Sequence, residues 1–403
     1  MAFIFRGDEK LLNTKATKLI LIFGLNLIVV LGLSSVPPAL PYIAKDFSIN
    51  PSESGLIISL FAFPGILFTP VLGILADRYG RKMVLVPSLF LFSIAGTMCA
   101  FTNDFHLLLL FRFLQGSGAA SLGAMTVILV ADLFSEEQRA TVLGYNFTVL
   151  GIFAASFPFI GGIIANYNWK YIFLLSLIAL PLAIWILTLK IDYIKSTDKL
   201  SNYFKNTISF IKTPATLILL FVSMITYIIL FGSFLTFTPF LVQKKFELTS
   251  VYMGLVITGM SLTQAVVSYF FGKIVKNINP IIIQFLVSWL YATGIAIFPY
   301  VKSYEMLILP ILFFGVAHGL NLPNIQNWLV SIAPLESRAA IMSTNRMVAQ
   351  IGQTIGPIII GTVFYFSSEY MQGLNYTFWG GAIFALLQSV IIYPLYKQYK
   401  MKN

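Results

Sequence analysis

The sequence predicts an all-α membrane protein in which twelve transmembrane helices form two pseudo-symmetric six-helix bundles. Three observations predict this fold class: the apolar composition, the regular spacing of apolar segments and an internal repeat. The 403-residue chain is 58% hydrophobic and 10% charged, with a mean hydropathy of +0.86. A soluble domain carries about 25% charged residues. This chain has too little polar surface to face water, and the lipid bilayer is the solvent that fits it.

Apolar stretches of about 20 residues between short charged loops indicate transmembrane helices. The ten-residue alternation of a membrane β-barrel is absent from the sequence. Prolines at Pro37, Pro38 and Pro41 interrupt the first stretch, which lacks a small-residue cleavage site and is expected to be retained as a span. The twelve spans are predicted at residues 17–40, 52–75, 83–101, 106–131, 141–165, 170–189, 215–240, 251–271, 281–300, 306–332, 341–365 and 375–396.

The net charge of +11 follows the positive-inside rule and predicts no nucleic-acid partner. If the N-terminus is cytoplasmic, nearly all other basic residues outside the spans fall in inner segments, and the outer segments hold only Lys45, Lys170, Lys244, Lys245 and Lys302. Both termini are therefore predicted to be cytoplasmic. The abundance of Ile, Lys, Asn and Phe is typical of low-GC bacteria, which predicts location in a bacterial inner membrane.

An internal repeat relates the two halves of the chain by a shift of 199 residues. It aligns Arg139 with Arg338 and Asn146 with Asn345, and such residues are rare enough in spans to disfavour chance. It predicts an N-terminal six-helix bundle over 1–189, a cytoplasmic linker over 190–213 and a C-terminal bundle over 214–403. Repeats of this kind commonly place a transport site between halves that rock alternately. Cys99 is the single cysteine, so no intrachain disulfide is possible.

The loop between the second and third spans reads Gly73-Ile-Leu-Ala-Asp77-Arg78-Tyr-Gly80-Arg81-Lys82. It resembles the cytoplasmic loop motif of the major facilitator superfamily, G-x-L-A-D-R-x-G-R-K. Gly73 permits close helix packing, Gly80 a tight turn, and Asp77 suits a helix N-terminus. The resemblance implies the major facilitator fold and a loop that latches the halves in the outward-open state. It also implies that the motif arginine pairs with the acidic residue ending span four, which gives a latch of Gly73, Asp77, Arg78, Gly80, Arg81 and Asp132.

Span four carries a second motif, Arg112-Phe-Leu-Gln115-Gly116-Ser-Gly118-Ala-Ala. It is similar to the R-x-x-Q-G-x-G-A-A motif of the drug:proton antiporter branch, the twelve-helix type. The spacing places Arg112, Gln115 and Gly116 on one helical face. An arginine inside a span costs about 2.5–3.5 kcal/mol on insertion scales, so it should face a cavity. The resemblance implies that Arg112 and Gln115 take part in proton coupling; the alternative is a structural arginine bonded to backbone carbonyls.

The antiporter motif of span five, G-x-x-x-G-P-x-x-G-G, is present only in part. Phe153 and Phe157 replace its two leading glycines. Small residues allow membrane helices to approach closely, so the remaining residues and their counterparts in span eleven are predicted to serve helix packing. This packing set is Pro158, Gly161, Gly162, Gly352, Gly356 and Pro357.

None of the fifteen acidic residues is predicted in mid-membrane. The candidates for lining a substrate cavity are therefore polar and aromatic side chains on other spans. His318 is a third candidate for proton coupling, since imidazole titrates near neutral pH. Arg112, Arg346 and His318 would make the cavity positive and favour an anionic, zwitterionic or neutral amphipathic substrate, such as a metal-chelating metabolite. The alternative role of such residues is polar contact between helices. The predicted cavity residues are Asn26, Tyr227, Phe234, Asn321, Asn324, Trp328, Arg346 and Gln350.

The features favour a secondary active transporter, with proton-coupled efflux of small molecules by alternating access as the leading hypothesis. The alternative is an importer of a small metabolite or organic anion, which the incomplete span-five motif leaves open. An enzyme is not expected, because no metal-ligand cluster, nucleophile triad or phosphate-binding loop occurs at usable spacing. A channel would not explain the latch motif. The expected partners are a small-molecule substrate, protons and the bilayer, with the proton gradient as driving force, no cofactor and no metal, in a monomer.

Overall fold

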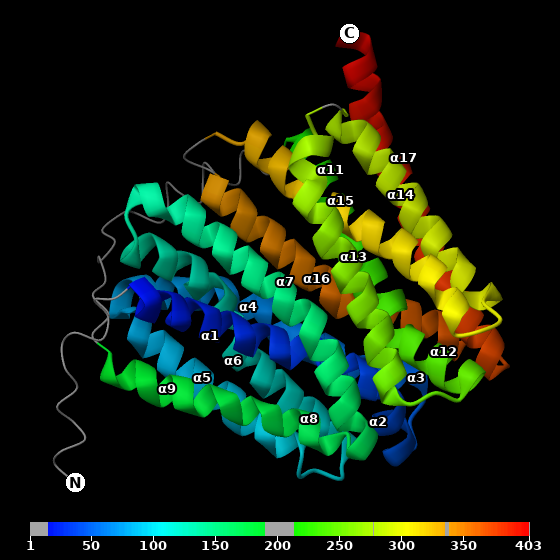
Figure 1. Cartoon of the computed structure of the whole chain (residues 1–403), viewed down its shortest axis with the longest axis horizontal. Coiled ribbons are helices and arrows are strands. Elements are labelled where there is room, and N and C mark those ends of the chain that lie inside the picture. The colour runs from blue at the N-terminus through cyan, green and yellow to red at the C-terminus, as the bar shows by residue number, and fades with distance from the viewer. Residues whose placement is uncertain (1–14, 190–212, 277, 335–337, 403) are drawn as a thin grey trace. The chain divides into compact units, whose positions relative to one another are not determined.

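A computed structural model describes residues 15–189, 213–276, 278–334 and 338–402 (Figure 1). Within these residues every regular element is a helix, and twelve segments are long and apolar enough to cross a membrane. They coincide with the twelve predicted spans, so the predicted fold class is confirmed. Residues 190–212 of the predicted linker lie outside the described part of the chain. The spans are Lys15–Asp46, Pro51–Thr69, Arg81–Cys99, Phe105–Val130, Glu137–Tyr167, Lys170–Thr188, Pro214–Phe246, Ser250–Ile274, Pro280–Tyr300, Glu305–Ile332, Ile341–Tyr365 and Tyr370–Lys397.

The chain divides into two compact units. The first comprises Met1–Ala39 and Leu60–Thr197, and the second Leu40–Ser59 and Asp198–Asn403. The C-terminal end of the first span therefore packs with helices of the second half, and the Tyr42 hydroxyl accepts a hydrogen bond from the Ser250 N–H at 3.2 Å. The bundle limits 1–189 and 214–403 stay a prediction.

The helices of the first unit (Figure 1) are α1 (Lys15–Ser34), η1 (Pro37–Ala39), α4 (Leu56–Tyr79, whose first residues belong to the second unit), α5 (Arg81–Cys99), α6 (Phe105–Leu133), α7 (Glu136–Tyr167), α8 (Lys170–Leu174), η2 (Leu175–Ile178) and α9 (Ala179–Thr188). Those of the second unit are α2 (Leu40–Asp46), α3 (Pro51–Ser54), α11 (Pro214–Tyr227), η3 (Ile228–Leu235), α12 (Thr236–Phe246), α13 (Ser250–Ile274), α14 (Pro280–Ile297), η4 (Phe298–Tyr300), η5 (Glu305–Leu307), α15 (Ile308–Ile332), α16 (Arg338–Tyr365) and α17 (Tyr370–Lys402).

The first span is broken between α1 and α2, so it extends beyond the predicted 17–40. Pro37 and Pro38 have no N–H to continue the α-helical ladder, and the residue before a proline disfavours α geometry. The chain passes through a bend and the short η1 before α2 begins. The last carbonyls of α1 are consequently free to accept hydrogen bonds from other helices.

The seventh span contains a π-helix, η3, between α11 and α12. Pro239 cannot donate to the carbonyl four residues earlier, which favours a local change of helical pitch. The Thr236 hydroxyl donates to the Phe231 carbonyl at 2.6 Å and satisfies a group near the end of this stretch. π-Helical turns occur frequently at functional sites.

The repeat seen in the sequence also governs where helices begin. The non-glycine residues recorded with left-handed backbone are Ser48 (φ 53°) and Glu247 (φ 54°), which differ by 199 positions. The helix starts at Arg81 and Pro280 also differ by 199. Both halves therefore use the same chain reversals at matching places, which supports the predicted pseudo-symmetry.

Glycines allow close contact between the helix pairs that the repeat relates. A Cβ added at Gly161 on α7 would lie 2.2 Å from the Ser35 carbonyl oxygen in the first span. In the second unit, a Cβ at Gly352 on α16 would lie 2.5 Å from the Met224 oxygen, and one at Gly356 would lie 2.9 Å from Ile228 Cα. These contacts agree with the expected packing use of the glycines.

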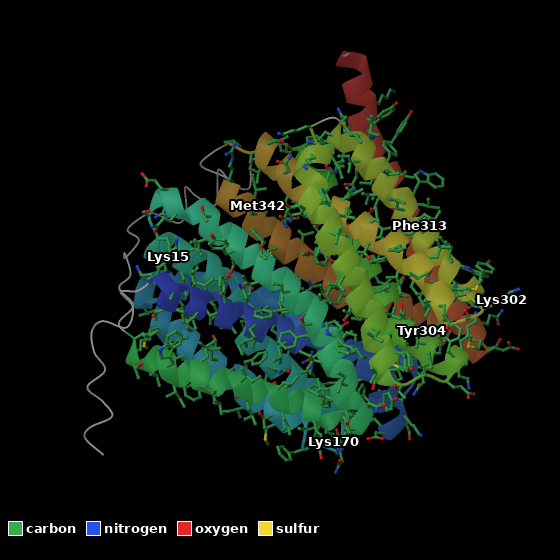
Figure 2. All side chains as sticks on the ribbon, viewed as in Figure 1. Lys15, Lys170, Lys302, Tyr304, Phe313 and Met342 are labelled. Atoms are coloured by element: carbon green, nitrogen blue, oxygen red, sulfur yellow. The ribbon has the colours of Figure 1, made fainter. Side chains whose placement is uncertain are left out.

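Large apolar side chains face outward on both units, as spans in contact with lipid require. Ile94, Val266 and Val390 are exposed examples. Lys15 and Lys170 lie at opposite ends of the helices of the first unit (Figure 2), which fits loops that alternate between two membrane faces.

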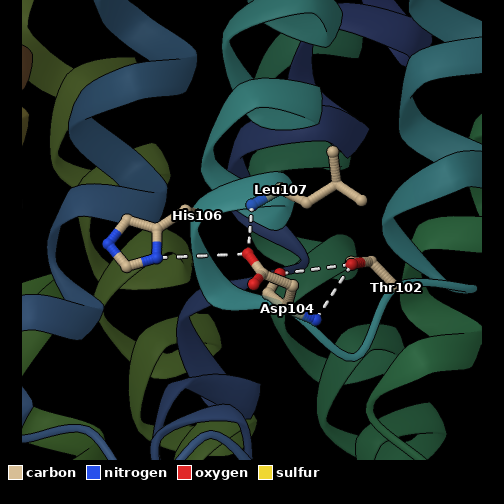
Figure 3. A network of polar contacts seen from close by, with 4 residues as sticks. All are labelled: Thr102, Asp104, His106 and Leu107. Carbon is tan, nitrogen blue, oxygen red and sulfur yellow. Dashed lines mark hydrogen bonds and ion pairs between the residues drawn. The ribbon is translucent and has the colours of Figure 1, made fainter.

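Helix α6 begins at a loop in which Thr102 and Asp104 hold the turn (Figure 3). The Asp104 N–H donates to the Thr102 hydroxyl at 3.1 Å, and the Asp104 carboxylate accepts from the Leu107 N–H at 2.8 Å. The exposed His106 ring lies 4.0 Å from the same carboxylate. Asp104 is therefore the N-cap of span four.

Replacing Asp104 by Ala is expected to destabilise the start of α6 by about 1 kcal/mol, because an orphan helix N–H loses its acceptor. Asp104→Asn keeps an acceptor oxygen and is the matched control. Thermal unfolding of the purified protein should show a lower Tm for the Ala variant alone. Equal Tm values for both variants would contradict the capping role.

Candidate functional site

The predicted latch loop brings together its arginine and the acidic residue of span four. Arg81 Nε donates to Asp132 Oδ2 at 2.9 Å, and the two side chains are 6% and 14% exposed. Gly80 has φ 99° and caps α5, a conformation that favours glycine. Gly73 and Asp77 lie on α4, but the side chain of Asp77 is outside the described part of the structure, and Arg78 is exposed. The expected pairing is present; the latching role remains a prediction.

Basic side chains to which the sequence analysis gave no capping role bind the end of α6 next to this ion pair. Lys18 Nζ donates to the Leu133 carbonyl at 2.9 Å, and Arg139 Nε donates to the Phe134 carbonyl at 3.2 Å, both at the C-terminal end of α6. Cations are favourable at helix C-termini, where carbonyls lack partners within the helix. The position of Arg139 in the first turn of the next helix could have predicted that it caps α6. The position of Lys18 in the sequence gives no such indication.

Asp132→Asn is expected to slow transport several-fold, because removing one partner of a largely buried ion pair leaves the Arg81 charge without its carboxylate. Glu137→Gln removes an exposed acidic group close by and is the control. Initial rates of substrate movement in proteoliposomes give the comparison. A wild-type rate for Asp132→Asn would show that the ion pair has no conformational role.

Arg112 is fully buried in the first unit and binds the broken first span. Both of its terminal nitrogens donate to the Gly32 carbonyl at 3.1 Å, in the last turn of α1, where the helix dipole is negative. Nη1 also donates to Gln115 Oε1 at 2.6 Å, and the guanidinium lies 4.2 Å from the centre of the Phe61 ring. Gln115 Nε2 donates onward to Ser176 Oγ at 2.8 Å. Arg112 and Gln115 therefore link α6 to α1, α4 and η2.

His318 lies inside the second unit and is 3% exposed. Its Nδ1 is 2.5 Å from the hydroxyl of Tyr291, a residue that the sequence analysis missed. The His318 ring also lies parallel to Phe314, which stacks on Phe234 at 4.6 Å between ring centres. The predicted cavity residue Phe234 is thus fully buried in an aromatic cluster of this unit.

Uncharged amides join α11, α14, α15 and α17 in the second unit. Gln284 Nε2 donates to Asn321 Oδ1 at 2.9 Å, and Asn321 Nδ2 donates to the Thr226 hydroxyl at 2.6 Å. Asn324 Nδ2 donates to the Pro280 carbonyl at 3.0 Å, and Gln388 also binds Thr226. Asn321 and Asn324 are fully buried, so they connect helices in this structure; a role in substrate binding stays a prediction.

The remaining predicted cavity residues differ in exposure. Asn26 is buried and donates to Asn146 Oδ1, which joins α1 to α7. Trp328 is half-buried against an apolar cluster of the second unit. Arg346 is exposed on α16, whereas Gln350 and Tyr227 are half-buried.

The profile of the Major Facilitator Superfamily matches residues 22–357 and 246–400 of this chain. The chain belongs to the major facilitator superfamily. Quinolone resistance protein NorA of Staphylococcus aureus is 25% identical over 381 residues, which cover 93% of this chain and 95% of NorA. The class H tetracycline resistance protein of Pasteurella multocida is 23% identical and covers 92% of this chain and 94% of its own length. These relatives support the predicted drug:proton antiporter branch.

Solved transporters of this superfamily share the fold. A bacterial homologue of the human lysosomal transporter Spinster, in an inward-facing unoccupied conformation, has a TM-score of 0.78 at 16% identity and covers 96% of this chain and 97% of its own. The D-xylose–proton symporter has a TM-score of 0.77 at 13% identity, with 93% and 96% covered. Identities this low support the fold alone. The chain is thus a multi-pass membrane transporter of a superfamily whose members are carriers.

Proposed function

We propose that this chain exports small molecules across a bacterial inner membrane in exchange for protons, by alternating access. The names of its relatives support efflux, since quinolone and tetracycline resistance proteins are similar along nearly the whole chain. The site observation that carries the proposal is the buried Arg112, held by Gln115 and by the free end of α1. A fixed charge beside a broken span can change its partners when that span moves, and thereby link charge to conformation.

His318 is the residue proposed to carry the proton. The chain has two histidines, and the other, His106, is exposed in the first turn of α6. His318 lies within a span, and its ring nitrogen has one strong partner, the Tyr291 hydroxyl. Imidazole accepts and releases protons near neutral pH, which suits a carrier that works without a carboxylate in the middle of its spans. Arg112, held by Gln115, supplies a fixed charge within the first unit. The Arg81–Asp132 pair acts as the latch.

The substrate is a drug or an amphipathic or anionic metabolite, such as a metal-chelating compound, and it binds among the predicted cavity residues. The chain works as a monomer with both termini in the cytoplasm and needs no cofactor beyond the proton gradient. A single cysteine added at the C-terminus tests the topology, because a membrane-impermeant thiol reagent should leave it unlabelled in right-side-out vesicles. Cys99 is fully buried and gives little background.

Import of a small metabolite is the second candidate function. One observation favours it: the span-five motif lacks its leading glycines. Inside-out vesicles with an acidic interior separate the two functions. An exporter should accumulate labelled substrate under this gradient, whereas a proton-coupled importer should not.

The deciding experiment measures substrate-induced proton movement in proteoliposomes with a pH-sensitive dye and a panel of cationic, anionic and zwitterionic compounds. Proton movement that is abolished in His318→Gln supports the proposal, because Gln can still bind the Tyr291 hydroxyl but does not titrate. Tyr291→Phe is the matched control for the loss of that hydrogen bond. Substrate flux without proton movement for any compound would reject proton coupling.

A further inference from the structure

Three side chains form a polar stripe along one face of α16. Arg346, Gln350 and Gln353 follow one another at spacings of four and three residues, so they project from neighbouring turns on the same side. Gln353 is buried, Gln350 is half-buried and Arg346 is exposed. The stripe therefore runs from a buried amide to an accessible positive charge.

Arg346 carries its charge inside a span, close to the end at which the span begins. The eleventh span begins at Ile341, so Arg346 lies about 8 Å along the helix axis from that end. No ion pair with Arg346 is present among the residues that the structure describes. A charged side chain at this depth generally faces protein or a water-filled space and not hydrocarbon.

Buried acceptors on the same helix lack donors. Gln350 Oε1 and Asn345 Oδ1 have no hydrogen-bond partner within the described protein, and Asn345 is 8% exposed. In the first unit the matching Asn146 accepts from Asn26. The position 199 residues after Asn26 holds Ile225, which cannot donate a hydrogen bond from its side chain. The second half therefore lacks the side-chain donor that Asn26 provides in the first half. A buried acceptor without a donor costs free energy unless a ligand supplies the donor.

An aromatic side chain on α11 packs against α16, the helix that carries the stripe. Gly352 lets α16 approach so closely that an added Cβ would lie 2.9 Å from Tyr227 Cβ. The Tyr227 ring stacks on Phe231 with 6.3 Å between centres. Aromatic faces bind planar apolar groups and guanidinium groups alike.

We infer that Arg346, Gln350 and Tyr227 form an anchor, within the second unit, for amphipathic substrates that carry a carboxylate beside a hydrogen-bond donor. The guanidinium and the Tyr227 hydroxyl donate to the carboxylate, the Gln350 oxygen accepts from the substrate donor, and the ring packs against its apolar part. The planar guanidinium fork matches a carboxylate in two parallel hydrogen bonds. The inference rests on the proposed transport of small molecules and names the substrate class.

A matched pair of dyes tests the anchor. Rhodamine 110 carries a free carboxylate, and rhodamine 123 is its methyl ester. Fluorescence polarisation with the purified full chain, in detergent without anionic lipid, should show about tenfold tighter binding of the acid, as a charge-assisted hydrogen-bonded pair gives. Arg346→Gln should remove this preference, and Arg346→Lys should retain part of it. Lys302→Gln removes an exposed loop charge and should leave the preference unchanged.

Several outcomes overturn the anchor: tighter binding of the ester by the wild-type protein, binding of neither dye, or an acid preference that persists in Arg346→Gln. Loss of the acid preference when phosphatidylglycerol is added at low molar ratio would assign the site to lipid headgroups and also overturn it. The proton assay keeps the two proposals apart. If the wild-type protein moves protons but Arg346→Gln still prefers the acid dye, the anchor alone is rejected. If the wild-type protein prefers the acid dye and Arg346→Gln does not, but no compound moves protons, the proton-coupled exporter alone is rejected.

Discussion

Arg112→Ala is expected to lower proton-coupled transport about 100-fold or more. The substitution removes donors to the Gly32 carbonyl and to Gln115, all within a buried region. A hydrogen bond to a charged group contributes about 1.5–3 kcal/mol, and about 2.7 kcal/mol corresponds to a hundredfold change in rate. The measurement is proton movement in proteoliposomes at matched protein content.

Two further variants separate function from folding at this position. Arg112→Lys keeps a positive charge but loses the planar fork that reaches both Gly32 and Gln115, so it should recover stability but little transport. Ser117→Ala lies on the same helix, where the Ser117 hydroxyl binds only the carbonyl of Phe113 four residues earlier, and it should behave as wild type. Full transport in Arg112→Lys would show that charge alone matters and that the hydrogen-bond geometry does not.

Gly161→Ala is expected to destabilise the first unit strongly and to stop transport. The added Cβ would lie 2.2 Å from the Ser35 carbonyl oxygen, a backbone atom that cannot move without displacing the broken first span. Overpacking of a close contact typically costs about 1–3 kcal/mol. Thermal unfolding in detergent should show a Tm several degrees below wild type, with a parallel loss of flux.

Helix α7 supplies its own control for this prediction. A Cβ added at Gly151 meets no atom within 4 Å, so Gly151→Ala changes helix composition without filling a contact. Alanine is also the better helix former. The Gly151→Ala variant should keep or slightly raise the Tm. Similar losses in both variants would attribute the effect to helix flexibility and not to the contact at Ser35.

The latch shows how a motif can predict a contact between distant residues. Arg81 and Asp132 are 51 positions apart, and the resemblance of the loop to the family motif predicts their pairing. The helix caps formed by Lys18 and Lys82 had no such signal. Lys82 donates to the Leu187 and Leu189 carbonyls at the end of α9, so the last residue of the motif binds next to the linker. Backbone carbonyls carry no sequence identity, and a pattern cannot name them.

The sequence by itself determined the twelve spans, the twofold repeat, the superfamily and the arginine motif. Hydropathy and repeated residues are local or periodic signals, and the bilayer enforces them because every span must satisfy its own backbone. Only the tertiary structure decided that His318 meets Tyr291, that Asn321 binds Gln284 and Thr226, and that Arg346 stays exposed on α16. Those contacts depend on how each helix is rotated and shifted against its neighbours. In spans that are almost uniformly apolar, the packing of the whole unit sets this rotation and shift, and no local pattern in the sequence does.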